Sequence, residues 1–254
     1  MDQKRIAIFA ENLYGGGVEK ILQIVCGNFD YNRYDLTLYA SRKESFPLDT
    51  YPKHLAIKYL FDEGDSIVAK LKNKLKLLIY YHFSSSVFYQ LFIREKYDVG
   101  IAFIEGYATR FLSGAPKKMK KMAWLHTDIE KNHWTDVAFQ SREEEIACYQ
   151  TFDKLICVST WVEKKAKQVL GNINTIVLYN PIDVKKIRNL SQNVVVLPQK
   201  SRIRIVSLGS LIPVKGYERL LKVVERLKRE GEQFELLILG DGEKRPEYEA
   251  YIKK

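Results

Sequence analysis

A run of three glycines opens the first helix expected in the sequence. Gly15, Gly16 and Gly17 follow an apolar strand, and Glu19 comes two residues later. Successive glycines let backbone N–H groups approach a ligand closely, and the start of a helix favours an anion. The spacing differs from the G-x-G-x-x-G fingerprint of dinucleotide sites. The segment therefore predicts either a phosphate-binding loop or a tight turn in which Glu19 complements the helix dipole.

A second glycine segment lies near the end of the chain. Residues 206–221 predict a buried strand, a turn that contains Gly209 and Gly216, and a helix whose first turn carries Lys215. Lys215 is suitably placed to neutralise a diphosphate. Another glycine loop, at 239–243, follows the next strand, so both loops should lie at the same edge of a sheet. Because the two loops agree, a phosphate site is favoured over a turn with a surface lysine.

Polar side chains follow two further strands, at the edge where open α/β sheets bind their ligands. His126 and Asp128 could hydrogen-bond sugar hydroxyls or adjust the charge near a leaving group. His126 could equally be a structural histidine, but its position at a strand end favours function. Glu105 could bind a hydroxylated acceptor or cap the next helix. A metal site on His126, Asp128 and His133 is possible, but the spacing of these residues is not diagnostic.

Residues 66–94 predict one long helix with an unusual excess of lysine. Apolar and aromatic residues at helical spacing alternate there with Lys70, Lys72, Lys74 and Lys76. Such a pattern suits attachment to an anionic membrane surface. A covering helix with a solvated lysine face would explain the apolar stripe but not the number of lysines.

Short apolar runs alternate with helical patterns along the rest of the chain, which predicts βαβ units and a parallel sheet covered on both faces. The expected strands are Arg5–Ala10, Asp35–Ala40, Ala56–Leu60, Val99–Ile104, Lys120–His126, Lys154–Ser159, Asn174–Tyr179, Ile203–Leu208 and Phe234–Leu239. The other expected helices are Val18–Asn28, Gln140–Gln150, Trp161–Leu170, Gly216–Glu230 and Glu243–Lys253.

The pattern divides the chain into an N-terminal Rossmann-like domain (1–183), a polar linker (184–201) and the first part of a second Rossmann-like domain (202–254). Two strands and two helices are few for an independent parallel domain. We therefore expect the last segment either to pack on the first domain or, as we favour, to continue beyond Lys254.

Composition narrows the class of protein. The net charge of +10 indicates an anionic partner, such as nucleic acid, anionic lipid or a phosphorylated small molecule. The first ten residues are too briefly apolar for a signal peptide, and Glu11 interrupts them. Cys26, Cys148 and Cys157 fall in apolar patterns and lack metal-ligand spacing, so we expect buried thiols and a cytoplasmic protein.

Taken together, these segments resemble the retaining GT-B-fold glycosyltransferases of family 4, the group 1 glycosyl transferases. The matching pieces occur in the family's order and spread over the chain: Gly15–Glu19, Trp124–His126, Cys157–Val162, Tyr179–Asp183, Gly209–Leu221 and Leu239–Gly242. No single piece is specific, but the ordered set is.

The resemblance implies two Rossmann-like domains facing across a cleft, with a nucleotide-diphosphate sugar on the second and a lipid-linked or polysaccharide acceptor on the first. It implies transfer with retention of anomeric configuration, no cofactor and no metal. Gly15–Gly17 would approach the donor phosphates, and His126 would contact the transferred sugar. Lys215, with Gly209 and Ser210, would hold the departing diphosphate.

Two departures from the family matter. Ser210 stands where an arginine commonly accompanies the lysine, which weakens the expected two-cation clamp. The paired-glutamate segment that binds the donor, and the helix that crosses back to the first domain, are expected beyond Lys254. We therefore expect sugar transfer by this chain to be impaired. If the protein attaches to lipid, we expect it on the inner face of the membrane.

Three other classes of protein stay open. A non-catalytic, membrane-associated acceptor-binding module would need a partner chain. A dinucleotide oxidoreductase is disfavoured, because this sequence lacks both the glycine fingerprint and an acidic residue placed after a second strand. A nucleic-acid binder is the weakest alternative, because the sequence has no zinc-finger, RNP or helix-turn-helix signature.

Overall fold

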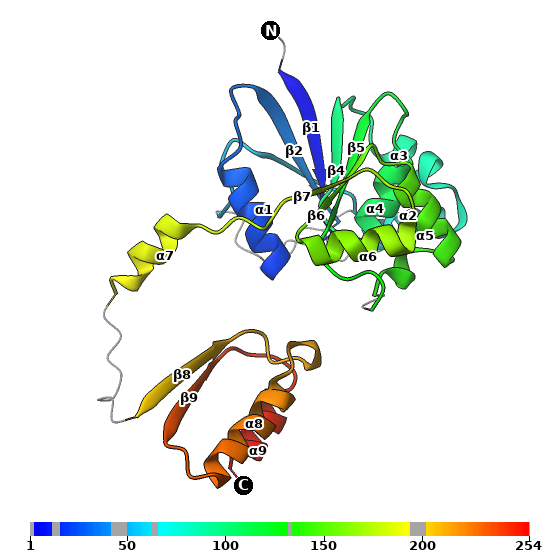
Figure 1. Ribbon diagram of the computed structural model, residues 1–254. Coiled ribbons are helices and arrows are strands. Elements are labelled where there is room, and N and C mark those ends of the chain that lie inside the picture. The colour runs from blue at the N-terminus through cyan, green and yellow to red at the C-terminus, as the bar shows by residue number, and fades with distance from the viewer. Residues whose placement is uncertain are drawn as a thin grey trace. The chain divides into compact units, whose positions relative to one another are not determined.

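The computed structural model describes residues 3–11, 16–41, 50–61, 66–131, 134–193 and 202–253. The chain forms two compact units, residues 1–187 and 188–254, each treated by itself (Figure 1). The boundary falls within helix α7 (Val184–Ser191), so the first part of the segment expected as a linker is helical.

The first unit contains a seven-stranded parallel sheet in the order β3-β2-β1-β4-β5-β6-β7. Its strands are β1 (Lys4–Phe9), β2 (Tyr34–Ala40), β3 (Ala56–Tyr59), β4 (Val99–Ala102), β5 (Lys120–Leu125), β6 (Lys154–Cys157) and β7 (Thr175–Val177). Strand order reverses between β1 and β4, and in open parallel sheets the loops at such a point form the ligand crevice.

Helices cover both faces of this sheet (Figure 1). Helix α1 (Gly17–Gly27) lies on one face, and the other carries α2 (Ile67–His82), α3 (Ser85–Phe92), α4 (Tyr107–Ser113), α5 (Arg142–Gln150) and α6 (Thr160–Leu170). A short 3-10 helix, Trp134–Ala138, precedes α5. Along β1, Phe9 packs toward the larger group of helices and Ile8 toward α1, so the alternation of a strand fills both cores.

The expected single helix over 66–94 is wrong. It is interrupted at Phe83 and Ser84, which have extended backbone angles, and α3 begins at Ser85. Serine competes for local backbone hydrogen bonds and favours helix starts over helix interiors. Helix α4 was implied only as the helix after Glu105, and its range was not predicted.

The second unit is a two-stranded parallel sheet, β8 (Ile203–Leu208) and β9 (Phe234–Leu239), with helices α8 (Tyr217–Arg229) and α9 (Arg245–Ile252). Its small core consists of Leu211, Tyr217, Leu221 and Tyr248. Several large apolar side chains of the strands are exposed: Ile203, Val206, Leu208 and Leu239.

Candidate functional site

The loops that follow β4 and β5 meet at the carboxyl edge of the first sheet. Glu105 follows β4, and His126 and Asp128 follow β5, so the structure brings the three predicted residues into one region. The adjacent strands β4 and β5 place these loops side by side.

Glu105 is fully buried, and its carboxylate fastens the two loops together. Its Oε1 accepts hydrogen bonds from the backbone N–H of His126 (2.5 Å), the N–H of Thr127 (2.7 Å) and the Thr127 hydroxyl (3.1 Å). Burial raises the pKa of Glu105, and these hydrogen bonds oppose the rise. The carboxylate thus holds the His126 loop in place rather than capping the next helix.

His126 is held in one orientation by its surroundings. Its Nε2 lies 2.8 Å from the carbonyl oxygen of Phe103, so Nε2 carries the proton and donates it. The ring stacks on Trp124 at 5.9 Å and lies 5.2 Å from the ring of Phe103. Burial lowers the pKa of His126 to about 4, so the ring is neutral at pH 7. Its Nδ1 is an enclosed acceptor without a hydrogen-bond partner in the described structure, so a hydroxyl that reached it could donate there.

Asp128 braces its own loop. Its Oδ1 accepts hydrogen bonds from the N–H groups of Glu130 (3.0 Å) and Lys131 (3.2 Å). Its Oδ2 accepts one from Nε1 of Trp161 (3.1 Å) on α6. Asp128 is partly exposed, so an acceptor hydroxyl could reach it. That hydroxyl would have to share the carboxylate with Glu130, Lys131 and Trp161.

The start of α1 presents Gly16 and Gly17, whereas Gly15 and His133 lie outside the described residues. No side chain caps this helix. The Glu19 carboxylate folds back over Gly16, so close that Oε2 would be 2.6 Å from an added Cβ. Glu19 therefore occupies the positive end of the helix, and a phosphate arriving there would have to displace it.

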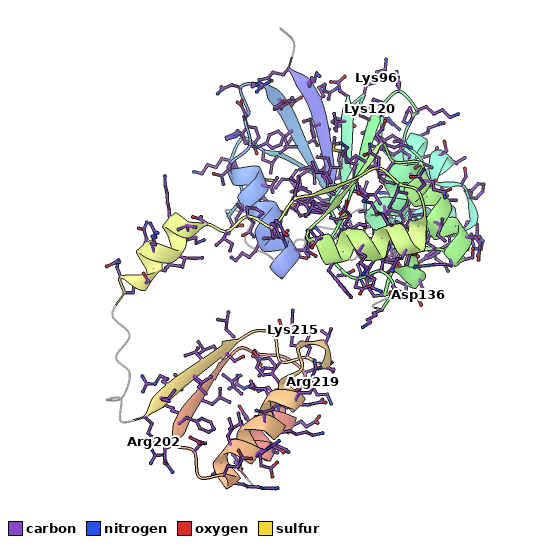
Figure 2. All side chains as sticks on the ribbon, in the orientation of Figure 1. Lys96, Lys120, Asp136, Arg202, Lys215 and Arg219 are labelled. Atoms are coloured by element: carbon purple, nitrogen blue, oxygen red, sulfur yellow. The ribbon has the colours of Figure 1, made fainter. Side chains whose placement is uncertain are left out.

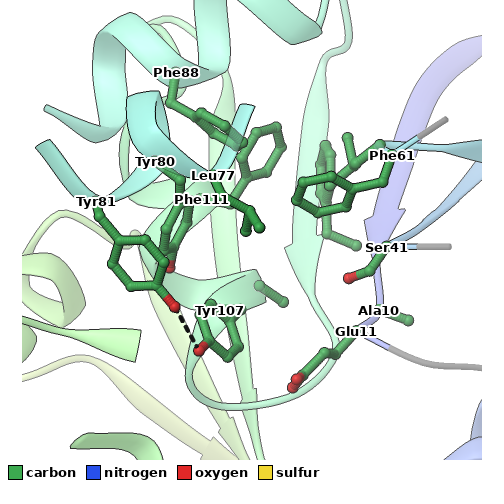
Figure 3. Close-up of a pocket in the computed structure, with 13 residues that line it drawn as sticks. Ala10, Glu11, Ser41, Phe61, Leu77, Tyr80, Tyr81, Phe88, Tyr107 and Phe111 are labelled. Carbon is green, nitrogen blue, oxygen red and sulfur yellow. Dashed lines mark hydrogen bonds between the residues drawn. The ribbon is translucent and has the colours of Figure 1, made fainter. Parts of the chain in front are cut away.

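An apolar cavity of about 280 Å³ opens beside the β1 end of the sheet (Figure 3). Its walls come from β1 and from helices α2, α3 and α4, and are mainly aromatic and aliphatic: Phe9, Leu60, Phe61, Leu77, Tyr80, Phe88 and Phe111. The size suits a small apolar or aromatic group.

Polar atoms on the wall of this cavity were not expected from the sequence. Glu11 contributes a carboxylate whose pKa is raised by burial and then by the charge of Glu19. The hydroxyls of Tyr81 and Tyr107 lie 3.0 Å apart, and that of Tyr107 also donates to the carbonyl of Val137 (Figure 3). Glu11 is the first charged residue after a buried strand, and this position could have indicated a residue of the site.

In the second unit the two glycine loops meet, as the sequence predicted. The N–H of Leu211 donates to the carbonyl of Asp241 (2.8 Å), and the N–H of Lys244 donates to that of Leu211 (3.0 Å). A Cβ added at Gly240 would lie 2.0 Å from the carbonyl oxygen of Gly209. Only glycine at 240 permits this approach, because the obstacle is backbone.

Two cations accompany these loops. Lys215 is exposed in the 3-10 helix Pro213–Lys215, and Ser210 is exposed in the loop before it. Gly216 starts α8 with φ 73°, and the Arg219 guanidinium folds back over it, with Nη2 2.9 Å from an added Cβ. Lys215 and Arg219 lie at the same end of the unit (Figure 2). Sequence reasoning missed Arg219, although a cation in the first turn of a phosphate-site helix was the available signal.

Of the four lysines predicted to face a membrane, three are exposed and one points inward. Lys70, Lys72 and Lys74 are exposed on α2. Lys76 points inward, because its Nζ donates to the carbonyl of Leu60 (2.9 Å) and lies 5.5 Å from the ring of Phe92. The part of the chain that the structure describes contains no group of three or more His, Cys, Asp or Glu side chains suited to a metal ion.

Comparison with known proteins gives a sequence match over one part of this chain and fold matches over nearly all of it. Residues 189–254 match the family described as "Glycosyl transferases group 1". No curated protein matches the sequence. Similar solved structures include the lipopolysaccharide outer core galactosyltransferase WaaB (18% identity, TM-score 0.64, 99% of this chain and 64% of that one).

Two further structures show the same fold. Anabaena Alr3699/HepE in complex with UDP and glucose has 16% identity and a TM-score of 0.63, over 99% of this chain and 64% of that chain. The catalytic domain of Starch Synthase IV from Arabidopsis thaliana, bound to ADP and acarbose, has 12% identity and a TM-score of 0.61, over 98% of this chain and 71% of that one. The chain thus spans about two thirds of the length of such enzymes.

The parallel sheet, its switch point and the second glycine-loop unit define a GT-B-type α/β protein. Within that class, the resemblance to the group 1 glycosyltransferases is confirmed, and residues 189–254 carry the family's sequence pattern.

Proposed function

We propose that this protein is a glycosyltransferase that moves a sugar from a nucleotide-diphosphate donor to a lipid-linked or polysaccharide acceptor. The observation that carries the proposal is the second unit, where the family match coincides with two contacting glycine loops and two exposed cations. Similar structures bind UDP with glucose, or ADP with acarbose, which supports uridine and adenosine diphosphate sugars as donors to test.

The proposed chemistry is a single exchange at the anomeric carbon. The bond to the diphosphate oxygen breaks, an acceptor oxygen bonds on the same face, and the acceptor's proton passes to the leaving diphosphate. Negative charge grows on the diphosphate, where Lys215 would stabilise it together with the loop of Gly209 and Ser210. No step requires a metal, in keeping with the family's retaining mechanism.

His126 would contact the transferred sugar. Its ring is neutral at pH 7, so Nδ1 would accept a hydrogen bond from a sugar hydroxyl once the surroundings of this enclosed nitrogen open. Glu105 would position this loop without touching substrate, because it is fully enclosed. The Gly15–Gly17 loop would approach donor phosphates once Glu19 moves, and Glu19 and Asp128 would offer carboxylates to acceptor hydroxyls. The apolar cavity with its tyrosine hydroxyls and Glu11 supports an acceptor that carries both apolar and hydroxylated groups.

The buried thiols of Cys26, Cys148 and Cys157 support a reducing compartment, and we propose the cytoplasm. Incubation with UDP-, ADP- and GDP-sugars, followed by detection of released nucleoside diphosphate and of the anomeric configuration of the product, tests the proposal. Weak transfer with retention is expected, in line with the impairment expected from the sequence. Lys215→Ala should abolish it, whereas Lys222→Ala, at an exposed lysine on the following helix α8, should not. Acceptor binding without transfer under every donor would favour the non-catalytic module instead.

A further inference from the structure

Helix α2 turns an apolar face away from the protein. Ile67, Leu71 and Leu75 are 84, 67 and 56% exposed, and Val68 and Leu78 are exposed beside them. The spacing of Ile67, Leu71, Leu75 and Leu78 places them along one side of the helix. We call these five side chains the α2 outer face.

The opposite side of α2 fixes this orientation. Ala69 and Tyr80 are buried, and the Tyr80 ring packs against that of Phe88 at 5.1 Å. The carbonyl of Tyr80 accepts a hydrogen bond from the buried guanidinium of Arg110 (2.5 Å). The helix therefore cannot roll its apolar outer face inward without breaking these contacts.

Cations border the α2 outer face. Lys72 and Lys74 are exposed on α2, and their positions place one on each side of the apolar row. Residues 66–92 contain no aspartate or glutamate, although the chain has 31 acidic residues among 254. The surface is therefore complementary to a plane of negative charge that overlies an apolar layer.

We propose that the α2 outer face docks onto an anionic lipid bilayer, with the leucines in the acyl boundary and the lysines at the headgroups. No helix in the described ranges is long and apolar enough to cross a membrane, so α2 would lie in the interface. The proposal rests on this surface alone and does not depend on sugar transfer.

Co-sedimentation of the full chain with vesicles tests the docking. Phosphatidylcholine vesicles containing about one third phosphatidylglycerol should bind the protein, and pure phosphatidylcholine should bind it far less. Lys72→Gln/Lys74→Gln should weaken binding to the anionic vesicles about 25-fold, since each lysine contributes about fivefold. Added salt should reduce binding by the wild type more than by this variant.

The apolar contribution has its own variant and control. Leu71→Gln/Leu75→Gln should lower vesicle affinity at least ~10-fold, because it removes apolar groups from the acyl boundary. Its thermal melting curve should not change, since both leucines are exposed. The matched change Leu190→Gln/Val223→Gln, of exposed residues elsewhere, should leave binding intact.

Three results would overturn the proposal. The wild type could fail to bind the anionic vesicles, or the leucine pair could leave binding unchanged. Light scattering could instead show a dimer that the leucine pair dissociates, in the absence of vesicle binding, which would assign the α2 outer face to a second copy of the chain.

Discussion

Glu105 offers the most discriminating test of how the site is built. Glu105→Leu removes the acceptor for the N–H groups of His126 and Thr127, which are 2.5 and 2.7 Å from Oε1. Each buried donor left without a partner costs about 1–3 kcal/mol, so the two cost about 2–6 kcal/mol. The Thr127 hydroxyl can rotate to another partner and adds little.

Leucine also relieves the burial of an ionisable group, which returns about 1–2 kcal/mol of the loss. The expected net loss is therefore about 3 kcal/mol in the free energy of unfolding, or a decrease of about 6–12 °C in melting temperature. Urea unfolding followed by circular dichroism measures it.

Glu105→Gln is the matched control. Glutamine keeps an acceptor oxygen for the two N–H groups and carries no charge, so its stability should lie within about 1 kcal/mol of the wild type at pH 7. Because the pKa of Glu105 is raised, its contribution to stability is full below about pH 4.5 and declines as the pH rises through the folded pKa. The stability of the glutamine variant relative to the wild type should therefore increase as the pH rises through the folded pKa of Glu105.

A leucine variant as stable as the wild type would refute the idea that Glu105 fastens the loop. So would a glutamine variant that is damaged as badly as the leucine variant, because the acceptor geometry would then be irrelevant.

Two further predictions concern stability. The pKa of His126 is lowered to about 4, so its neutral ring contributes stability that is complete above about pH 6.5 and is lost as the pH falls toward 4. Between pH 7 and pH 5 the wild type should lose about 2 kcal/mol more than His126→Phe, in urea unfolding at each pH, and parallel losses would contradict this. Gly114→Ala should cost about 3 kcal/mol or more, because the new Cβ would lie 2.1 Å from the backbone of Ser85 at the start of α3. Gly27→Ala, whose Cβ meets nothing within 4 Å, should be neutral in the same thermal melts.

The sequence was sufficient to predict the parallel sheet. Buried strands read as continuous apolar runs, and all seven strands of the first unit lie within the predicted ranges or one residue outside them. Helix α4 escaped prediction because its buried side includes Thr109 and Arg110, which look like surface residues in a sequence. Arg110 can be buried because partners distant in the sequence satisfy its guanidinium: Glu144, 34 residues away, pairs with it at 2.8 Å, and the carbonyl of Tyr80 accepts a second hydrogen bond.

The site was predictable in place but not in detail. Sheet topology puts Glu105 and His126 at one edge, so strand order alone brought them together. The direction of the Glu105 carboxylate depends on backbone N–H groups 21 residues later, which no local pattern encodes. Arg219 was missed for a similar reason, since its approach to Gly216 depends on the left-handed backbone there.

Calorimetric titration with UDP and with ADP would show whether the glycine loops of the second unit bind a diphosphate. We expect saturable binding that Lys215→Ala weakens at least ~10-fold, since one charge-assisted contact to phosphate contributes about 1.5–3 kcal/mol. Arg219→Ala should also weaken it, because its guanidinium would supply the second cation that Ser210 cannot, whereas Lys222→Ala should not. Failure of the wild type to bind either nucleotide, or binding that is indifferent to Lys215, would contradict the assignment of a diphosphate site to these loops.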